Sequence, residues 1–127
     1  MKSIHKTYVF NSPIDKVWDA FVNPKTIDSW GGGKAEMSEK EGFEFSLWDG
    51  TIFGKNTKVH KNKLLEQDWY SGDKWPEPSN LIFKFSSKDD ITTVEMIHLN
   101  IPDDEADSIN EGWDTYYLGP MKELLEK

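Results

Sequence analysis

The chain has 127 residues, of which 30% are charged and 13% aromatic, and its 23 acidic and 15 basic residues give a formal net charge of −8. Every basic residue is a lysine, so we expect no nucleic-acid partner and no arginine clamp for phosphate or carboxylate groups. The absence of cysteine removes disulfides, thiolate nucleophiles and thiolate metal ligands.

The N-terminal residues contain no apolar run of the kind found in a signal peptide. No stretch of the chain approaches the roughly 18 apolar residues of a membrane span. We therefore expect a cytoplasmic location and no membrane insertion. The length suits one domain with a substantial core, and we expect residues 1–127 to form that single domain.

A first strand and two short helices are predicted at the start of the chain. Alternating residues predict the strand over residues 3–10. Ser12 is a candidate N-cap for a helix beginning at Pro13. The apolar stripe of that helix is formed by Ile14, Val17, Trp18 and Phe21. A second helix is predicted to begin at Asn23-Pro24 and to end at Gly31.

Beyond Gly31, alternating segments are separated by turn residues about every ten positions, which is typical of an antiparallel meander. The predicted strands cover residues 34–39, 42–48, 51–59, 63–70, 80–87 and 91–100. Asp49-Gly50 is the strongest hairpin signal, because glycine tolerates the positive φ of a primed turn.

A long helix is predicted from Asp103 to Lys127. Its apolar stripe consists of Ala106, Ile109, Trp113, Tyr116, Tyr117, Met121 and Leu124. Gly119-Pro120 predicts a kink or break in this helix, since an interior proline removes a backbone hydrogen bond. A helix with such a stripe needs an apolar partner. The sequence therefore predicts an α+β fold in which a curved antiparallel sheet of about six to seven strands wraps around the C-terminal helix.

The histidines do not form a metal-binding pattern. His5, His60 and His98 stand apart, with no second ligand at helical spacing, so we expect no metal and no cofactor. His98 shares strand parity with Thr92, Val94 and Met96 and is predicted to point into the interior. It is either a hydrogen-bonded residue in a cavity wall or a catalytic base, and the first interpretation is favoured.

Two further patterns are incomplete. The segment 31–34, Gly-Gly-Gly-Lys, is followed by Ala35 where a phosphate loop has serine or threonine, so a flexible joint between helix and sheet is favoured. Asp68 and Glu95 lie in strand-like segments, where a catalytic pair of carboxylates is less expected than two solvent-facing side chains. We therefore predict no catalytic residues.

The aromatic side chains remain as candidates for a binding site. Three strands each present one apolar parity, formed by Phe43, Phe45 and Leu47, by Leu65, Gln67 and Trp69, and by Leu81, Phe83 and Phe85. If these faces turn toward the C-terminal helix, the interior suits either a small apolar ligand or ordinary core packing. The pattern alone favours ordinary packing slightly over a ligand site.

Trp75-Pro76 lies in the longer loop 71–79. Loops often carry function, so Trp75 and Pro76 are candidates for a lid or a partner contact. The alternative is a Trp75 ring folded back over the sheet edge.

Four segments together resemble a known family. They are Ser12 to Phe21, Gly42 to Gly50, Trp75-Pro76 and Gly112 to Tyr117. In this order, and over nearly the whole chain, they are similar to the activator of heat-shock protein 90 ATPase homologues. These proteins belong to the START-like, or SRPBCC, superfamily with the helix-grip fold.

The resemblance implies a seven-stranded sheet that grips the C-terminal helix around a cavity, with two short helices after the first strand. Members of one domain generally have no assigned catalytic residues, and relatives elsewhere in the superfamily bind lipids, polyketides or other hydrophobic molecules. The resemblance implies a cavity-wall role for Phe45, Trp69, Met96, His98, Trp113 and Tyr117, and strand parity adds Phe83.

The chain also departs from the family pattern. It has Glu41-Gly42 where the family often has Gly-Gly, and Trp69-Tyr70 where the family often has Trp-Arg. An electrostatic contact made by that arginine is therefore absent. The eukaryotic co-chaperone also carries a separate N-terminal domain that does much of the chaperone binding, and this chain is too short to contain it.

Three functions follow as hypotheses. The leading one is a non-enzymatic domain, monomeric or weakly dimeric, that holds a small hydrophobic molecule between the sheet and the helix. The alternative is an interaction module of the stress response that binds a heat-shock protein 90 homologue, suggested by Trp75-Pro76 and by the segment Gly112 to Tyr117. The third, least favoured, is a cyclase- or hydrolase-type enzyme that uses His98 or Asp68.

Overall fold

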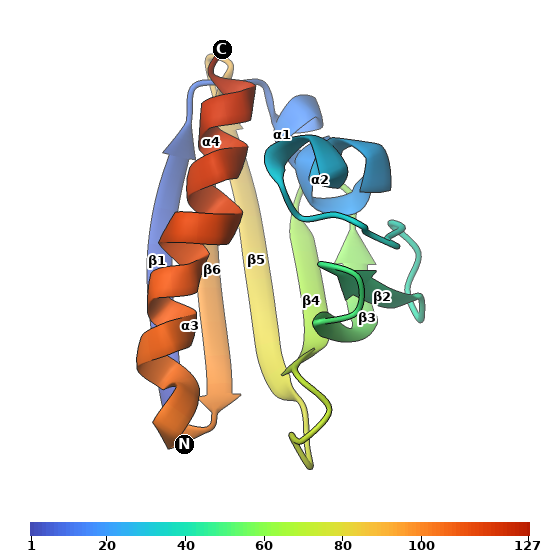
Figure 1. The fold of residues 1–127 in the computed structure, drawn as a ribbon. Helices are drawn as coiled ribbons and strands as arrows, with labels where there is room; N and C mark the ends of the chain where they lie inside the picture. Colours follow the sequence, from blue (N-terminus) through green and yellow to red (C-terminus); the bar gives the residue numbers. More distant parts are fainter.

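The computed structural model describes residues 1–127 and contains a six-stranded antiparallel sheet with all of its helices on one face (Figure 1). The strands are β1 (Lys2–Phe10), β2 (Glu44–Leu47), β3 (Ile52–His60), β4 (Leu64–Ser71), β5 (Ser79–Lys88) and β6 (Ile91–Ile101). Their order across the sheet is β1-β6-β5-β4-β3-β2. The first strand therefore pairs with the last, and β1 and β2 form the two edges.

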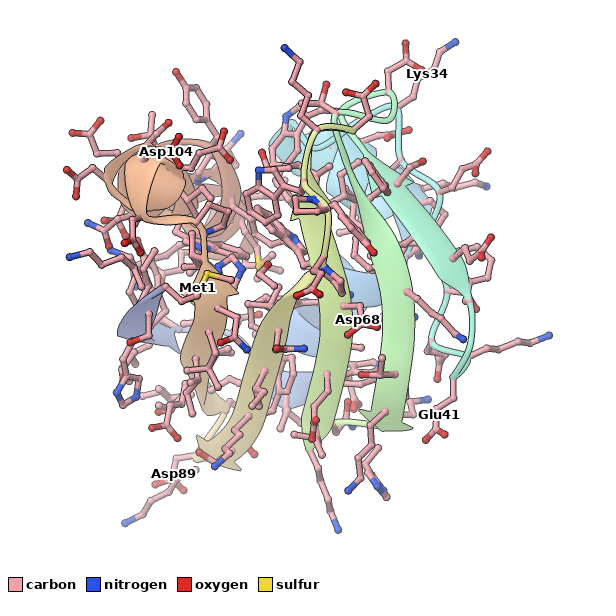
Figure 2. The ribbon with its side chains drawn as sticks, turned by 90° about the horizontal axis from the view of Figure 1, so that it is seen from below. Met1, Lys34, Glu41, Asp68, Asp89 and Asp104 are labelled. Atoms are coloured by element: carbon pink, nitrogen blue, oxygen red, sulfur yellow. The ribbon has the colours of Figure 1, made fainter.

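Two short helices and one long one cover the sheet. The short helices are α1 (Ile14–Val22) and α2 (Pro24–Trp30). The long one is built from four consecutive segments, η1 (Asp103–Glu105), α3 (Ala106–Gly112), η2 (Trp113–Leu118) and α4 (Gly119–Leu125). It runs in front of β1 and β6, while α1 and α2 lie to its side (Figure 1). In the view along the strands, the labelled Asp104 and Lys34 lie on the same side of the bent sheet (Figure 2).

The predicted strand parities are confirmed on the face that meets the helices. The buried residues of β4, β5 and β6 alternate as expected up to His98 and are Leu65, Gln67, Trp69, Ser79, Leu81, Phe83, Phe85, Thr92, Val94, Met96 and His98. Ile101, at the end of β6, is also buried but lies outside this alternation. Together with the helices they build one cluster of 27 buried hydrophobic residues. The α+β architecture with a gripped C-terminal helix is therefore confirmed.

The strand predicted at residues 34–39 is wrong, which leaves six strands rather than seven. Only a single bridge, between Glu36 and Ser46, joins this segment to the sheet. The buried side chain of Asn56 explains its path, because the amide Nδ2 donates to the carbonyl oxygens of Ser38, at 2.8 Å, and Lys40, at 3.3 Å. A side chain thus binds carbonyl groups that a neighbouring strand would otherwise use.

The capping prediction for the first helix is also wrong. Pro13 occupies the N-cap position of α1 and no side chain caps the helix, while the hydroxyl of Ser12 is buried without a partner. For the second helix the prediction is confirmed. The side chain of Asn23 accepts a hydrogen bond from the backbone N–H of Lys25, and Gly31 ends the helix in a left-handed conformation, with φ 108°.

The C-terminal helix does not break at Gly119-Pro120, because a π-helical segment, η2, precedes the proline and α4 follows it directly. The wider turn changes which side chains face the sheet. Tyr116, predicted in the buried stripe, is 65% exposed, and Leu118, which lay outside the predicted stripe, is fully buried. The period of 3.6 residues behind the prediction does not hold across a π-helical turn.

The hairpin at Asp49-Gly50 is confirmed in position, and its connection is a wider turn than expected. Trp48, Asp49 and Gly50 all have positive φ between β2 and β3. The glycine-rich joint at 31–34 runs beside this turn, since the N–H groups of Trp48 and Asp49 donate to the carbonyls of Gly32 and Lys34. The joint therefore anchors the turn against α2.

Candidate ligand-binding site

A cleft of about 470 Å³ opens between the C-terminal helix and the ends of β3 and β4. Its walls come from three parts of the fold: the β2–β3 hairpin, the last residues of β4, and the segments α3 and η2. The lining residues are Trp48, Thr51, Ile52, Trp69, Ser71, Ser108, Ile109, Gly112, Trp113, Tyr116 and Tyr117. None of them carries a formal charge.

The cleft stays open partly because of Gly112. A Cβ atom built on this residue would find no other atom within 4 Å, so the helix presents bare backbone to the cleft. Its φ of −61° is ordinary helical geometry, which any residue can adopt. Neither the backbone conformation nor a neighbouring atom therefore requires glycine at position 112, and a larger side chain there would occupy open space.

Aromatic rings connect the sheet wall to the helix wall without interruption. Trp69 of β4 stacks on Trp113 of η2, with ring centroids 5.6 Å apart. Trp113 in turn contacts Tyr117 at 4.6 Å, and Tyr117 contacts Trp48 of the hairpin at 6.0 Å. The last two contacts are tilted or edge-on, so the rings form a connected aromatic wall that offers apolar contacts to a ligand.

Behind this wall, His98 joins the helix to the sheet. The indole N–H of Trp113 donates to Nδ1 of His98 at 3.2 Å, and Nε2 of His98 lies 2.8 Å from the hydroxyl of Ser79. The Ser79 hydroxyl itself donates to the carbonyl of Trp69 at 2.7 Å. Because Nδ1 accepts, the proton of the neutral ring is assigned to Nε2. Burial lowers the pKa of His98 to about 3, so the ring is neutral near pH 7.

Three of the seven predicted cavity residues line the cleft, and four do not. Trp69, Trp113 and Tyr117 form its inner wall. The others are packed into the core beneath it; these are Phe45, Phe83, Met96 and His98. Their role in holding a ligand stays a prediction.

Sequence reasoning missed most of the rim. The cleft residues that were not predicted are Trp48, Thr51, Ile52, Ser71, Ser108, Ile109, Gly112 and Tyr116. Two signals were available: Trp48 directly precedes the predicted turn, and Gly112 directly precedes Trp113 on the helix. Neither signal says that the turn and the helix face each other across an open space, since that depends on the sheet's curvature.

The Trp75 ring folds back against Trp69 of β4, which is an interior strand, and not over an edge strand of the sheet. It is 9% exposed, lies 6.1 Å from Trp69 between ring centroids, and donates its indole N–H to the carboxylate of Glu105. Pro76, next to it, is exposed. A lid or partner contact by these two residues stays a prediction.

The acidic candidates lie away from the cleft. Residues paired across neighbouring strands share a face, so Gln67, Leu81 and His98 lie on the helix side, and Asp68 lies on the other. On that outer face, Asp68 accepts a hydrogen bond from Asn80 at 3.4 Å, and Glu95 contacts His5 at 2.7 Å. Asp68 and His98 therefore cannot act on one substrate.

An antiparallel sheet that grips a C-terminal helix, with a cleft between them, defines a helix-grip protein of the START-like, or SRPBCC, class. A sequence model of the family described as "Activator of Hsp90 ATPase homolog 1-like protein" matches residues 11–126. The chain belongs to this family.

Curated relatives and solved structures agree with that assignment. The chain is 31% identical over 114 residues to an activator of 90 kDa heat shock protein ATPase homologue from Dictyostelium discoideum, covering 87% of this chain and 29% of the relative. A mouse homologue 2 of that activator is 19% identical, with 98% of this chain and 38% of the relative covered. The chain thus spans about a third of the length of the curated relatives it matches.

Solved structures of similar size share the fold. An HSP90 activator from Plasmodium falciparum superposes with a TM-score of 0.91 at 25% identity, covering 98% of this chain and 96% of that one. The Aha1 dimer from Colwellia psychrerythraea gives 0.84 at 19% identity, with 99% and 97% covered, and at that identity it shows the fold alone. No helix of the present chain has the length and apolar character needed to span a membrane.

Proposed function

We propose that this chain binds a small, mostly apolar molecule in the cleft between η2 and the β2–β3 hairpin. The observation that carries the proposal is the cleft itself, with about 470 Å³ of space walled by Trp48, Trp69, Trp113 and Tyr117. Ligand sites in proteins commonly enclose about 300–1,000 Å³ and combine apolar walls with a few polar groups. The hydroxyl groups on the rim supply such polar groups.

The chemistry of the cleft supports binding rather than conversion of a ligand. A general base must reach the proton it removes and must have a pKa near the working pH. His98 meets neither condition, since both ring nitrogens are engaged and burial lowers its pKa to about 3. The cleft walls contain hydroxyl groups but no acid or base beside them.

The test uses the open space at Gly112. N-phenyl-1-naphthylamine, a neutral aromatic probe whose emission rises in apolar surroundings, is titrated into the wild type and into Gly112→Leu. The leucine side chain would project into the cleft, where a Cβ at this position meets nothing within 4 Å. We expect saturable binding by the wild type and at least a tenfold weaker affinity for Gly112→Leu.

The matched control is Glu111→Leu, which adds the same side chain one position earlier, on an exposed residue outside the cleft. Its affinity for the probe is expected to equal that of the wild type. Equal affinities of all three proteins would place the probe elsewhere and remove the support for a cleft ligand. Circular dichroism checks that both variants keep the fold before the affinities are compared.

A second candidate function is the stimulation of a heat-shock protein 90 homologue. It is favoured by the names of the similar proteins and by one specific length comparison. The Plasmodium falciparum structure named as an HSP90 activator is covered over 96% of its chain, so a chain of this size carries that name there. Because that structure is similar in length to this chain, we propose the interaction here, although the chain spans only about a third of the longer relatives.

This candidate is tested by the ATP turnover of the host's heat-shock protein 90 homologue with increasing amounts of the chain. We expect faster turnover and a complex on size-exclusion chromatography. Pro76→Ser changes an exposed loop residue without touching the buried ring of Trp75, and it tests the predicted loop contact. Unchanged turnover together with no complex would retire this function and leave the cleft proposal intact.

A further inference from the structure

Two hydrogen-bond donors on the wall of the cleft have no partner in the protein. Trp69 is 4% exposed, and its indole Nε1 is buried without a hydrogen bond. Tyr117 is 3% exposed, and no protein group bonds its hydroxyl, whereas the hydroxyl of Tyr8 donates to Asp114. Both residues line the cleft.

Three other indoles are satisfied, whereas that of Trp18 is not. The indole of Trp30 donates to the carbonyl of Ala20 at 2.9 Å, and the indoles of Trp75 and Trp113 donate to Glu105 and His98. Most buried polar groups in proteins are hydrogen-bonded, because an unpaired donor loses its bonds to water without replacement. The indole of Trp69 is therefore a buried donor that needs an explanation. The hydroxyl of Tyr117 is unpaired as well, but it is not fully buried and remains free to donate to a molecule in the cleft.

The surroundings of Tyr117 leave the cleft as the direction from which an acceptor can come. Its ring is packed among aromatic rings that offer no acceptor atom, namely those of Phe21, Trp30, Trp48, Phe83 and Trp113. Burial raises the pKa of Tyr117 above its ordinary value, so the hydroxyl keeps its proton and remains a donor near pH 7.

The charge of the lining restricts the ligand further. None of the lining side chains is acidic or basic. A charged ligand would lose its hydration on entering without gaining a paired charge. Flat aromatic ligands, by contrast, can pack against Trp48 and Tyr116, the more exposed rings of the lining.

We propose that the ligand of the cleft is a neutral, flat aromatic molecule with at least one accepting oxygen, such as a ring ketone, and that Trp69 or Tyr117, or both, donate to that oxygen. This inference rests on the proposed function, since it names the chemical class that the same cleft selects. The two donors make the site prefer an aromatic ketone over the hydrocarbon of the same shape.

The experiment compares 9-fluorenone with fluorene, two tricyclic molecules of nearly equal shape, of which only the first has a carbonyl oxygen. Affinities are measured by quenching of tryptophan emission. A neutral hydrogen bond contributes about 0.5–1.5 kcal/mol, which corresponds to a preference for fluorenone of about twofold to twelvefold. In Tyr117→Phe, which removes only the hydroxyl, we expect this preference to fall while fluorene binds as before.

Nuclear magnetic resonance of the ¹⁵N-labelled indoles gives a readout that needs no variant. The Trp69 N–H signal is expected to move downfield with fluorenone and not with fluorene. Trp18 provides an internal control, because its indole is also buried without a partner but lies outside the cleft. Its signal should stay in place with both compounds.

The outcomes separate this inference from the proposal it rests on. Equal affinity for both compounds, or a fluorenone preference that survives in Tyr117→Phe with no shift of the Trp69 indole signal, overturns the acceptor proposal and leaves cleft binding in place. Failure of both compounds to bind, while N-phenyl-1-naphthylamine binds and is blocked by Gly112→Leu, overturns the acceptor proposal alone. Failure of all three compounds overturns both.

Discussion

The two ends of the interior use the same kinds of side chain to opposite effect. At the end covered by α1 and α2, Phe21 makes edge contacts with Phe83 at 4.7 Å and with Phe85 at 5.1 Å, and no cleft remains between them. At the other end, Trp69 and Trp113 stack and still border about 470 Å³ of open space. Aromatic content therefore does not decide whether a region is packed core or a ligand-binding site. What differs is the placement of the strands and helices around the rings, which leaves open space at one end only.

The largest effect is expected at the packed end, for Phe83→Ala. Phe83 is fully buried against Phe21, Trp113 and Tyr117. Truncating such a ring removes its burial and leaves a cavity, which lowers the free energy of unfolding by about 3–5 kcal/mol. Urea denaturation measures this value.

The matched variant at the open end is Tyr116→Ala. Tyr116 is 65% exposed, so its loss should change the free energy of unfolding by no more than about 0.5 kcal/mol. Similar losses for the two variants would mean that the two ends are packed alike, and the comparison would fail.

A second prediction concerns Gly119→Ala, at the first residue of α4, directly after η2. A Cβ on Gly119 would lie 2.0 Å from the carbonyl oxygen of Asp114, which is a backbone atom and cannot swing away. The helix would have to change its π-helical turn, and we expect a loss of about 1–3 kcal/mol in the free energy of unfolding. Because Trp113 and Tyr117 belong to that turn, binding of the cleft probe should weaken as well. Unchanged stability would show that the turn is freely adjustable.

A third prediction uses the pH dependence of His98. Its pKa is lowered from 6.5 to about 3 in the folded protein, so between these values the unfolded chain binds a proton that the folded one does not. The stabilisation is complete above pH 6.5 and is lost as the pH falls toward 3, with a slope of up to about 1.4 kcal/mol for each pH unit.

The comparison for this prediction is His98→Gln, in which the side-chain amide can accept from Trp113 and donate to Ser79 without titrating. Urea denaturation between pH 7 and 5 should show the free energy of unfolding falling more steeply for the wild type than for His98→Gln. Asp114, whose pKa is lowered by its bonds to Tyr8 and Lys6, loses its stabilisation at lower pH and does so in both proteins. Parallel pH profiles would show that His98 is not held neutral by burial.

The sequence was sufficient for the elements that depend on a regular period. The parities of β4, β5 and β6 follow directly from alternation, and Asn23 and Gly31 mark the ends of α2 by local capping rules. Where the period itself changes, the prediction failed. Tyr116 was assigned to the buried stripe because a single period of 3.6 residues was carried across η2, where the turn is wider.

The site was less predictable than the fold, for a physical reason. Trp69, Trp113 and Phe83 have the same apolar character in sequence, yet the first two border the cleft and the third is core. The strand at 34–39 failed for a related reason, since the long-range bonds of the Asn56 side chain leave no local pattern. Contacts between segments far apart in the chain decide both cases.

A small effect of opposite sign separates two glycines within one helix. Gly112→Ala adds a methyl group at a helical φ of −61°, where a Cβ meets no atom within 4 Å. Replacing glycine at such a position reduces the freedom of the unfolded chain and raises the free energy of unfolding by about 0.4–1 kcal/mol. The same change at Gly119 is expected to destabilise, so one substitution type has opposite signs seven residues apart. Thermal denaturation of both variants tests this difference, and a destabilised Gly112→Ala would mean that the cleft is filled or closed in solution.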